Sequence, residues 1–253
     1  MENKMLDDCL KQLHLPTIRS CFLEAAGIAV QNNLSYEQYL LSLAEQELEA
    51  RSQKRIRRFQ RQSKLPMEKT IAVFDRKRLP DKVNRLVTIL LQGDFTDRCE
   101  NVLAFGNPGS GKTHLVCAIG HELILQGKRV FFSPCSLLVQ SLLVAKRDLT
   151  LSKYLKRLAQ YDAIIIDDIG YVQQNNEEME VLFTLLAERY EKSSIMITSN
   201  LPFSKWDKIF KDPMTTAAAI DRLVHHSVIL ELNISSYRLE NAGKNLNEAT
   251  REK

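Results

Sequence analysis

The sequence predicts an α/β protein with a five-stranded parallel sheet, preceded by a small all-helical domain. Three observations support this prediction. From residue 102 onward, short apolar runs alternate with helical segments, which is typical of a parallel sheet covered by helices on both faces. A glycine-rich loop joins the first of these runs to the helix after it. Residues 1–64, in contrast, have the pattern of helices throughout.

The N-terminal region contains one long predicted helix that begins after Ser35. Ser35 and Gln38 form a capping box, in which each side chain satisfies a backbone N–H group of the first turn. Apolar side chains then recur at helical spacing, at Tyr36, Tyr39, Leu40 and Leu43. No glycine or proline follows until Pro66, so the helix is expected to run for about 30 residues.

The remaining elements follow in order along the chain. Residues 66–80 have the pattern of a linker, and a helix is expected from Asp81 to about Leu91. Strands are predicted over residues 102–105, 130–133, 163–166, 195–198 and 228–232. Helical sequence lies between them, over residues 112–125, 136–160 and 177–191.

The loop after the first predicted strand has the pattern of a phosphate-binding loop, which is glycine, four residues, then Gly-Lys-Thr. Glycines are needed because successive backbone N–H groups must curl around phosphate oxygens at unusual backbone angles. The helix that follows directs its positive N-terminus at the same phosphates. Lys112 is predicted to bridge the β- and γ-phosphates, and the Thr113 hydroxyl to ligate Mg²⁺. The predicted ATP-binding residues are Gly106, Asn107, Pro108, Gly109, Ser110, Gly111, Lys112, Thr113 and His114.

Two adjacent carboxylates, Asp167 and Asp168, end the third predicted strand. Ligands bind at the carboxyl ends of strands in open α/β sheets, so this pair is expected near the phosphates. Asp167 would hold Mg²⁺, directly or through water, and Asp168 would position or deprotonate the attacking water. Turn formation is the alternative role for the pair. Asp168 is one methylene shorter than the glutamate of many such ATPases, so slow intrinsic turnover is expected.

Two further polar residues are candidates for the same site. Asn200 follows the fourth predicted strand, where it would hydrogen-bond the γ-phosphate or the water, or else form a turn before Pro202. Arg222 follows Asp221 at the end of a predicted helix. It either complements the helix dipole or acts as an arginine finger that completes a neighbouring subunit's site, and spacing alone leaves both roles open.

These motifs, in this order, resemble the AAA+ ATPases, and most closely the bacterial branch of replication initiators, DnaC-type helicase loaders and IstB-type transposition helpers. Asp-Asp in place of Asp-Glu is frequent in that branch. The N-terminal region resembles the IstB type in particular, through residues 13–16, 34–37 and 45–49, the basic run that follows, and residues 64–66 and 74–75. The likeness continues through residues 171–172, 221–226 and 236–238, so it covers nearly the whole chain.

The resemblance implies an AAA+ core and an ATPase that works beside an insertion-sequence transposase. Such proteins assemble as homo-oligomers on double-stranded DNA with ATP and Mg²⁺, and hydrolyse ATP at subunit interfaces. By similarity, Arg222 is the arginine finger, and Arg238 stands where a γ-phosphate sensor is expected. Only 21 residues follow Leu232, so no full C-terminal lid is expected, which leaves the role of Arg238 open.

Positive charge is concentrated in the second half of the long helix. Residues 51–64 contain seven lysines or arginines and no acidic residue. Like charges four residues apart repel one another, and phosphate contacts would relieve that repulsion, although a solvated charged helix is the ordinary alternative. The predicted DNA-binding residues are Arg51, Lys54, Arg55, Arg57, Arg58, Arg61 and Lys64. A second basic cluster lies between the second and third strands and comprises Lys146, Arg147, Lys153, Lys156 and Arg157.

The predicted organisation is therefore a helical DNA-binding domain over residues 1–65, a linker over 66–80, an AAA+ domain over 81–238 and a polar tail over 239–253. A DnaC-like helicase loader, a small-molecule kinase and a scaffold that binds but scarcely hydrolyses ATP are the alternatives. No apolar run is long enough to span a membrane and no signal peptide is evident, so a cytoplasmic protein is expected. The five cysteines are scattered, which favours reduced thiols over disulfides or a metal site.

Overall fold

The computed structural model describes residues 2–170, 176–202, 205–206, 220–221 and 223–237. The chain divides into two compact units, Met1–Arg58 and Phe59–Lys253. Helix α3 (Tyr36–Ser63) belongs to both, because it begins in the first unit and ends in the second. The predicted tail over residues 239–253 lies outside the described residues.

The first unit consists of α1 (Glu2–Gln12), α2 (Pro16–Gln31) and the first part of α3. Leu10, Phe22 and Leu43 form its buried apolar cluster. The predicted capping box is confirmed, because Gln38 N donates to Ser35 Oγ at 3.2 Å and Ser35 N donates to Gln38 Oε1 at 2.9 Å. Helix α3 has 28 residues, in agreement with the expected length of the long helix.

A buried carboxylate fixes the start of α2 against α3. Glu47 is only 3% exposed, and it accepts hydrogen bonds from Thr17 N at 2.8 Å and Ile18 N at 3.1 Å. Arg51 Nε donates to the same carboxylate at 2.8 Å. No side chain at Leu15 caps α2, so Glu47 satisfies orphan N–H groups of its first turn from another helix.

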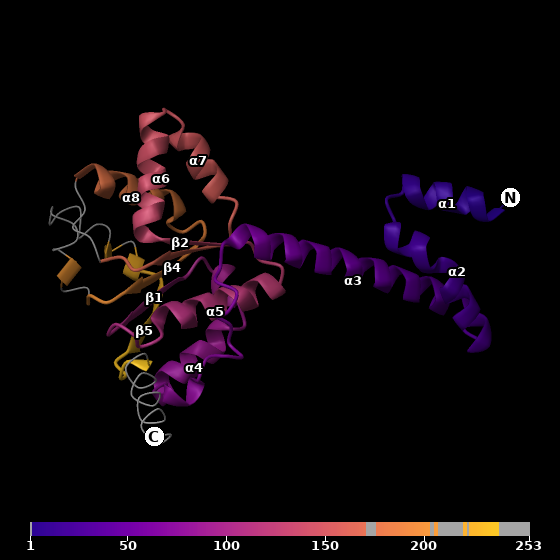
Figure 1. Ribbon diagram of the computed structural model, residues 1–253, viewed down its shortest axis with the longest axis horizontal. Coiled ribbons are helices and arrows are strands. Elements are labelled where there is room, and N and C mark those ends of the chain that lie inside the picture. The colour runs from indigo at the N-terminus through magenta and orange to yellow at the C-terminus, as the bar shows by residue number, and fades with distance from the viewer. Residues whose placement is uncertain (1, 171–175, 203–204, 207–219, 222, 238–253) are drawn as a thin grey trace, which may run out of the picture. The chain divides into compact units, whose positions relative to one another are not determined.

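The second unit is built on a five-stranded sheet, as the sequence predicts. Its strands are β1 (Asn101–Gly106), β2 (Val130–Pro134), β3 (Ala163–Asp167), β4 (Ser194–Ser199) and β5 (Ser227–Leu232). All of them are parallel and follow the order β2-β3-β4-β1-β5 (Figure 1). The loop after β1 therefore lies beside the carboxyl ends of β4 and β5, and β3 ends one strand further along.

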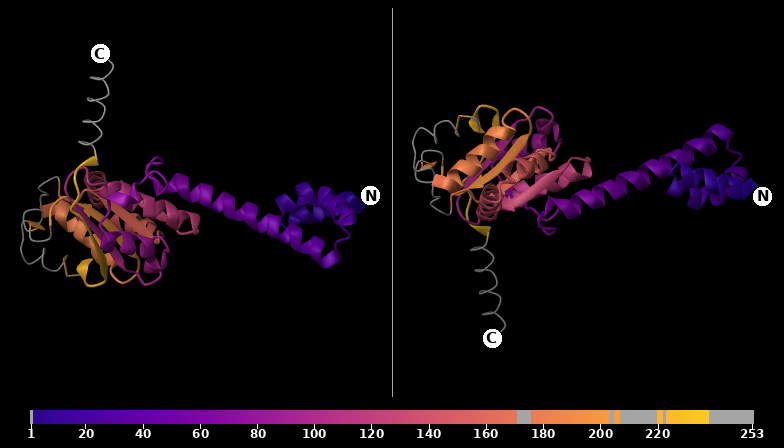
Figure 2. Two further views of the ribbon diagram at one scale, coloured as in Figure 1. Left: turned by 90° about the horizontal axis from the view of Figure 1, so that it is seen from below. Right: turned by 90° about the horizontal axis from the view of Figure 1, so that it is seen from above.

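Helices cover both faces of this sheet. Helices α4 (Asp81–Leu90) and α5 (Lys112–Leu125) lie on one face, and α6 (Cys135–Arg147), α7 (Leu151–Leu158) and α8 (Asn176–Arg189) lie on the other (Figure 1). Figure 2 shows these two layers from opposite sides. The predicted helical stretch 136–160 forms two helices, because Leu149 takes a left-handed φ of 54° and Thr150 N donates back to Ala145 O at 2.8 Å.

A buried arginine holds together the backbone segments around the start of β4. Arg189 is 2% exposed and donates to the carbonyl oxygens of Leu158 at 3.0 Å, Tyr161 at 2.9 Å and Ser194 at 2.9 Å. Burial lowers the pKa of its guanidinium to about 10, which still leaves it charged at neutral pH. Arg189 thus holds the end of α7 and the turn after α8 in fixed positions.

Candidate nucleotide-binding site

The glycine-rich loop follows β1 and precedes α5, and its backbone requires glycine. Gly106, Gly109 and Gly111 have φ values of 153°, 79° and 92°. A Cβ atom at Gly106 would lie 2.3 Å from Leu232 O, and one at Gly109 would lie 2.1 Å from Ser236 Oγ. The chain at and after β5 therefore packs so closely on the loop that a side chain at either glycine would force it away.

Lys112 lies at the start of α5 and turns back over the loop. It is 7% exposed, and its Nζ donates hydrogen bonds of 2.8 Å to the carbonyl oxygens of Gly106 and Asn107. The hydroxyl oxygen of Ser110 is buried and has no hydrogen-bond partner among the described residues. A helix N-terminus, a buried ammonium group and an unsatisfied hydroxyl in one loop form a site suited to an anion.

The two predicted carboxylates lie at the end of β3, where Thr198 of β4 contacts the Asp167 side chain and the Asp168 backbone. Thr198 Oγ1 donates to Asp167 Oδ1 at 2.6 Å and accepts from Asp168 N at 2.8 Å. Burial raises the pKa of Asp168, the negative charge of Asp167 raises it further, and Lys112 acts in the opposite direction. The charge of Lys112 therefore acts on Asp168 electrostatically.

Asn200 reaches the other side of the loop from the end of β4. Its Oδ1 is buried and has no hydrogen-bond partner among the described residues. Asn200 lines a cavity of about 260 Å³ together with Phe105, Gly106, Asn107, Pro202, Ile229, Glu231 and Asn233. An unpartnered buried carbonyl oxygen in such a cavity can accept a hydrogen bond from a water molecule.

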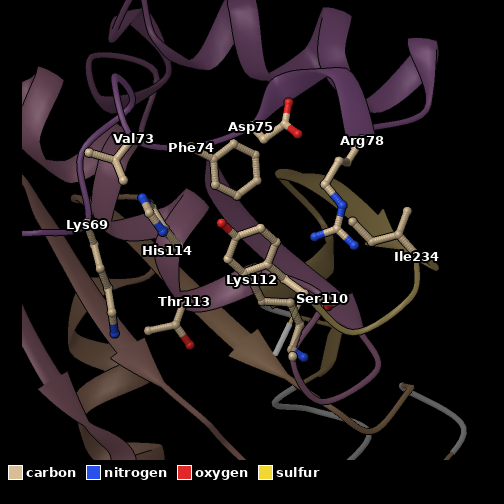
Figure 3. Close-up of a pocket in the computed structure, with 13 residues that line it drawn as sticks. Lys69, Val73, Phe74, Asp75, Arg78, Ser110, Lys112, Thr113, His114 and Ile234 are labelled. Atoms are coloured by element: carbon tan, nitrogen blue, oxygen red, sulfur yellow. The ribbon is translucent and has the colours of Figure 1, made fainter. Parts of the chain in front are cut away.

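A pocket of about 280 Å³ lies against the loop and has an apolar wall (Figure 3). Gly109–His114 form its polar side. Apolar and aromatic side chains form the opposite side, namely Val73, Phe74, Ile234 and Tyr237, with Lys69, Asp75 and Arg78 around them. A mostly apolar pocket with polar groups on one side is an arrangement that suits a nucleotide.

Residues 69–78 form part of this wall, although the sequence analysis assigns them only a connecting role. His114 Nε2 lies 2.9 Å from Thr70 O, and the His114 ring contacts the Phe74 ring edge-on with centroids 5.2 Å apart. Asp75 caps the short 3-10 helix η1 (Arg76–Arg78) by accepting from Lys77 N at 3.1 Å. The apolar run over residues 71–74, between charged residues, was the available signal for these missed residues.

The segment after β5 closes the pocket from another side. Tyr237 N donates to Gly109 O at 3.0 Å, and the Arg78 guanidinium stacks over the Tyr237 ring at 5.1 Å. Arg78 Nη2 also donates to Ser235 O at 3.1 Å. The glycine-rich loop, residues 69–78 and residues 234–237 are thereby joined, and neither Ile234 nor Tyr237 was predicted as a site residue.

The remaining predicted site residues either are not part of the lining of this pocket or lie outside the described residues. Arg222 and Arg238 belong to the second group. All seven basic residues of the 51–64 run are exposed. Arg51 pairs with Glu47 within the first unit, and Lys64 in the second unit places Nζ 5.4 Å from the Phe131 ring centroid. In the second basic cluster, Lys146 pairs with Glu180 at 2.7 Å.

Comparison with known proteins identifies relatives across nearly the whole chain. The family model of the IstB-like ATP binding protein matches residues 8–245. An insertion sequence ATP-binding protein of Sinorhizobium fredii is 42% identical over 234 residues, which are 92% of this chain and 78% of the relative. The insertion sequence IS21 ATP-binding protein of Pseudomonas aeruginosa is 37% identical over 96% of this chain and 91% of its own length.

Solved structures share the fold of the second unit. The DnaC helicase loader matches with a TM-score of 0.53 and 17% identity over 67% of this chain and 98% of its own. AMPPCP-bound DnaA from Aquifex aeolicus matches with a TM-score of 0.55 and 20% identity over 74% of this chain and 56% of its own. These likenesses establish the AAA+ fold. In the part of the chain that the structure describes, no helix is both long and apolar enough to cross a membrane.

Proposed function

Because the chain belongs to the family of IstB-like ATP-binding proteins, we propose that it is an ATPase that oligomerises on duplex DNA and assists an insertion-sequence transposase. ATP binding follows from the family, and the AAA+ P-loop fold agrees with it. Hydrolysis, assembly on DNA and help to a transposase are the further steps of the proposal. The observation that carries it is the pocket in which the glycine-rich loop faces an aromatic wall.

The side chains around the loop fit a nucleotide with Mg²⁺. Thr113 and Asp167 supply hard oxygen ligands, and the negative charge that raises the pKa of Asp168 would be relieved by a cation. Mg²⁺ would neutralise developing phosphate charge when it is bound. The carbonyl oxygens of Gly106 and Asn107 hold Lys112 Nζ in the loop. When ATP binds, Lys112 would exchange these partners for phosphate oxygens.

Hydrolysis also requires a positioned water molecule and a group that takes its proton. Asp168 suits the second role because burial raises its pKa, which makes its carboxylate a stronger base. Asn200 suits the first role through its unpartnered Oδ1 beside the loop. We assign the arginine finger to Arg222, which would act on the site of a neighbouring subunit, while Arg238 stays a proposed phosphate sensor.

The DNA part of the proposal rests on the basic run over residues 51–64. All seven side chains are exposed on or directly after α3, and no acidic residue separates them. Such a surface binds phosphates without regard to base sequence, and binding of this kind weakens steeply with salt. Arg51 also forms an ion pair with Glu47. Residues 1–65 are therefore proposed as a DNA-binding domain.

The transposase is the proposed protein partner because relatives of this chain are named as ATP-binding proteins of insertion sequences. A DnaC-like helicase loader shares the fold and is the alternative. The basic run favours nucleic acid over a helicase, because a protein groove for the helical unit does not require seven like charges. The two functions differ in whether duplex DNA supports assembly.

The test is assembly on random-sequence duplex DNA, measured by gel shift and particle imaging with ATP, with ADP and with Lys112→Ala protein. The proposal predicts discrete multimers that form only with ATP and dissociate as the salt concentration is raised. Glutamine should replace five basic residues together, namely Lys54, Arg55, Arg57, Arg58 and Arg61. The slope of log affinity against log salt concentration should then become shallower by about one for each charge removed. Neutralising Lys82 and Arg85, two exposed charges of α4 outside both basic clusters, is the control.

Two outcomes would contradict the proposal in different ways. Tight ATP binding without duplex-dependent assembly would exclude the DNA role and direct the search to a helicase partner. Assembly on DNA without ATP turnover, even with transposase present, would indicate a nucleotide-gated scaffold.

A further inference from the structure

Two histidines and a glutamate converge at the edge of the sheet opposite the nucleotide loop. Glu191 follows α8 and precedes β4, while His225 and His226 immediately precede β5. One ligand atom from each of the three lies within 4.8 Å of the other two. These residues stand at the amino ends of their strands, whereas the glycine-rich loop and the aspartate pair stand at the carboxyl ends. The cluster is therefore separate from the proposed Mg²⁺ site.

The backbone on both sides of the cluster is fixed. On the first side, Lys192 N and Ser193 N donate to Arg189 O at 3.0 and 3.2 Å, and Arg189 is itself buried. On the second, Asn101 N donates to His226 O at 2.7 Å and His225 N donates to Asp221 O at 2.9 Å. The three ligand atoms are thus brought together by segments that the core holds in place.

The three side chains of the cluster face a common region. The His225 and His226 rings meet edge-on with centroids 4.3 Å apart, so two imidazoles from adjacent residues face one region. The Tyr190 hydroxyl lies 3.4 Å from His225 Nδ1 and can orient that ring, as outer-shell partners of metal-bound histidines do. Lys192 follows Glu191 in the turn after α8, and it pairs with Glu188 at 3.8 Å.

We infer that Glu191, His225 and His226 form a binding site for a divalent transition-metal ion of the Zn²⁺ class. Two imidazole nitrogens and one carboxylate oxygen are a ligand set that Zn²⁺ takes, with water in the fourth position. Zinc bonds of about 2.1 Å place tetrahedral ligand atoms about 3.4 Å apart. Exposed side chains can close from the observed spacing by rotation about their own bonds. Mg²⁺ prefers oxygen ligands and would not compete.

A metal here joins the turn after α8 to the segment that follows Asp221. That segment continues from Arg222, the residue proposed to act on a neighbouring subunit, so metal occupancy would restrain it. This consequence rests on the proposed function. Metal binding itself does not, because it depends only on the three side chains.

The experiment is a calorimetric titration of the untagged full chain with Zn²⁺ in the presence of excess Mg²⁺. One Zn²⁺ per chain is expected, and each of His225→Ala, His226→Ala and Glu191→Gln should weaken it by at least about tenfold. His14→Asn is the matched control: it removes an exposed histidine of the first unit, and asparagine tolerates its φ of 55°. Circular dichroism and ATP binding establish that each variant is folded.

Cobalt distinguishes this site from the five free cysteines of the chain, because a thiolate ligand gives Co²⁺ an intense charge-transfer band. We expect bound Co²⁺ to give a spectrum without that band. This spectrum should be absent from the variants. The inference is overturned if the wild type binds no Zn²⁺, if the double variant of His225 and His226 binds as well as the wild type, or if the thiolate band appears. Failure of these tests would leave ATP binding and DNA assembly untouched.

Discussion

The hydroxyl group of Thr198 donates a 2.6 Å hydrogen bond to Oδ1 of Asp167, from the strand beside it. The same hydroxyl accepts from the backbone N–H of Asp168 at 2.8 Å. One side chain of β4 therefore sets the orientation of the carboxylate proposed for Mg²⁺ and of the backbone that carries the proposed base. Thr198 would act through Asp167 and Asp168, so it is a positioning residue.

Thr198→Val should lower the kcat for ATP hydrolysis by about 10- to 100-fold, because it removes this hydrogen bond while keeping the side-chain shape. The Mg²⁺ concentration for half-maximal activity should rise, while ATP affinity without Mg²⁺ stays the same. Thr198→Ser keeps the hydroxyl and should restore most of the activity. A Val variant with normal kcat and normal Mg²⁺ dependence would show that Asp167 does not depend on Thr198.

Asp168→Asn should separate catalysis from stability. Loss of the base should reduce hydrolysis by at least about 100-fold while ATP still binds. Burial raises the pKa of Asp168 above its value in the unfolded chain. Ionisation of Asp168 therefore lowers the free energy of unfolding. This loss is complete above the native pKa and absent below the unfolded pKa. The variant should therefore have a higher Tm than the wild type at pH 7, and the difference should vanish at about pH 3. An equal Tm at both pH values would contradict this account.

Phe74→Ala should weaken ATP binding by about fivefold, since an aromatic contact contributes roughly 1 kcal/mol. Phe74 lines the pocket and contacts His114 of the loop. Met67→Ala is the control. Met67 lies just before residues 69–78, is 65% exposed and does not line the pocket. Calorimetry with ATP measures both, and equal affinities for the two variants would remove residues 69–78 from the nucleotide site.

Glu47→Gln should loosen the helical unit at neutral pH. Burial favours the protonated form, but the hydrogen bonds from Arg51, Ile18 and Thr17 outweigh it and lower the pKa of Glu47. A lowered pKa gives stability that is present above the unfolded pKa and lost as the pH falls through the native one. The opening free energy of the Thr17 and Ile18 amides should drop by about 1–3 kcal/mol in hydrogen exchange.

The control for that change is Glu49→Gln, on the exposed side of the same helix, which should leave both amides as protected as in the wild type. Below the native pKa of Glu47, the wild type and Glu47→Gln should exchange alike. A difference that persists in acid would mean that the charge of Glu47 is not what holds α2.

Local patterns in the sequence were enough to predict the elements. Spacing at 3.6 residues predicted α3, and the capping box at Ser35 and Gln38 lies where expected. Continuous apolar runs predicted the five parallel strands, because a strand buried on both faces has no polar alternation. Gly109 and Gly111 were predictable because their left-handed backbone excludes other residues.

Contacts between distant parts of the chain were not predictable in this way. Periodicity gives the face of a residue but not which strand lies beside it, so the role of Thr198 on Asp167 depended on the order of β3 and β4. Residues 69–78 have no regular period and were assigned as a linker, but they pack on His114 and Tyr237. Glu191 and His225 are 34 residues apart and meet at the amino edge of the sheet.

The sequence by itself determined the helices, the strands and the glycine loop, because each depends on neighbours a few residues away. The tertiary structure decided which side chains surround that loop, which carboxylate replaces the cap of α2, and which histidines lie beside Glu191. Those arrangements depend on packing between segments, since the free energy of burial fixes the order of the sheet and thereby the partners at its edges.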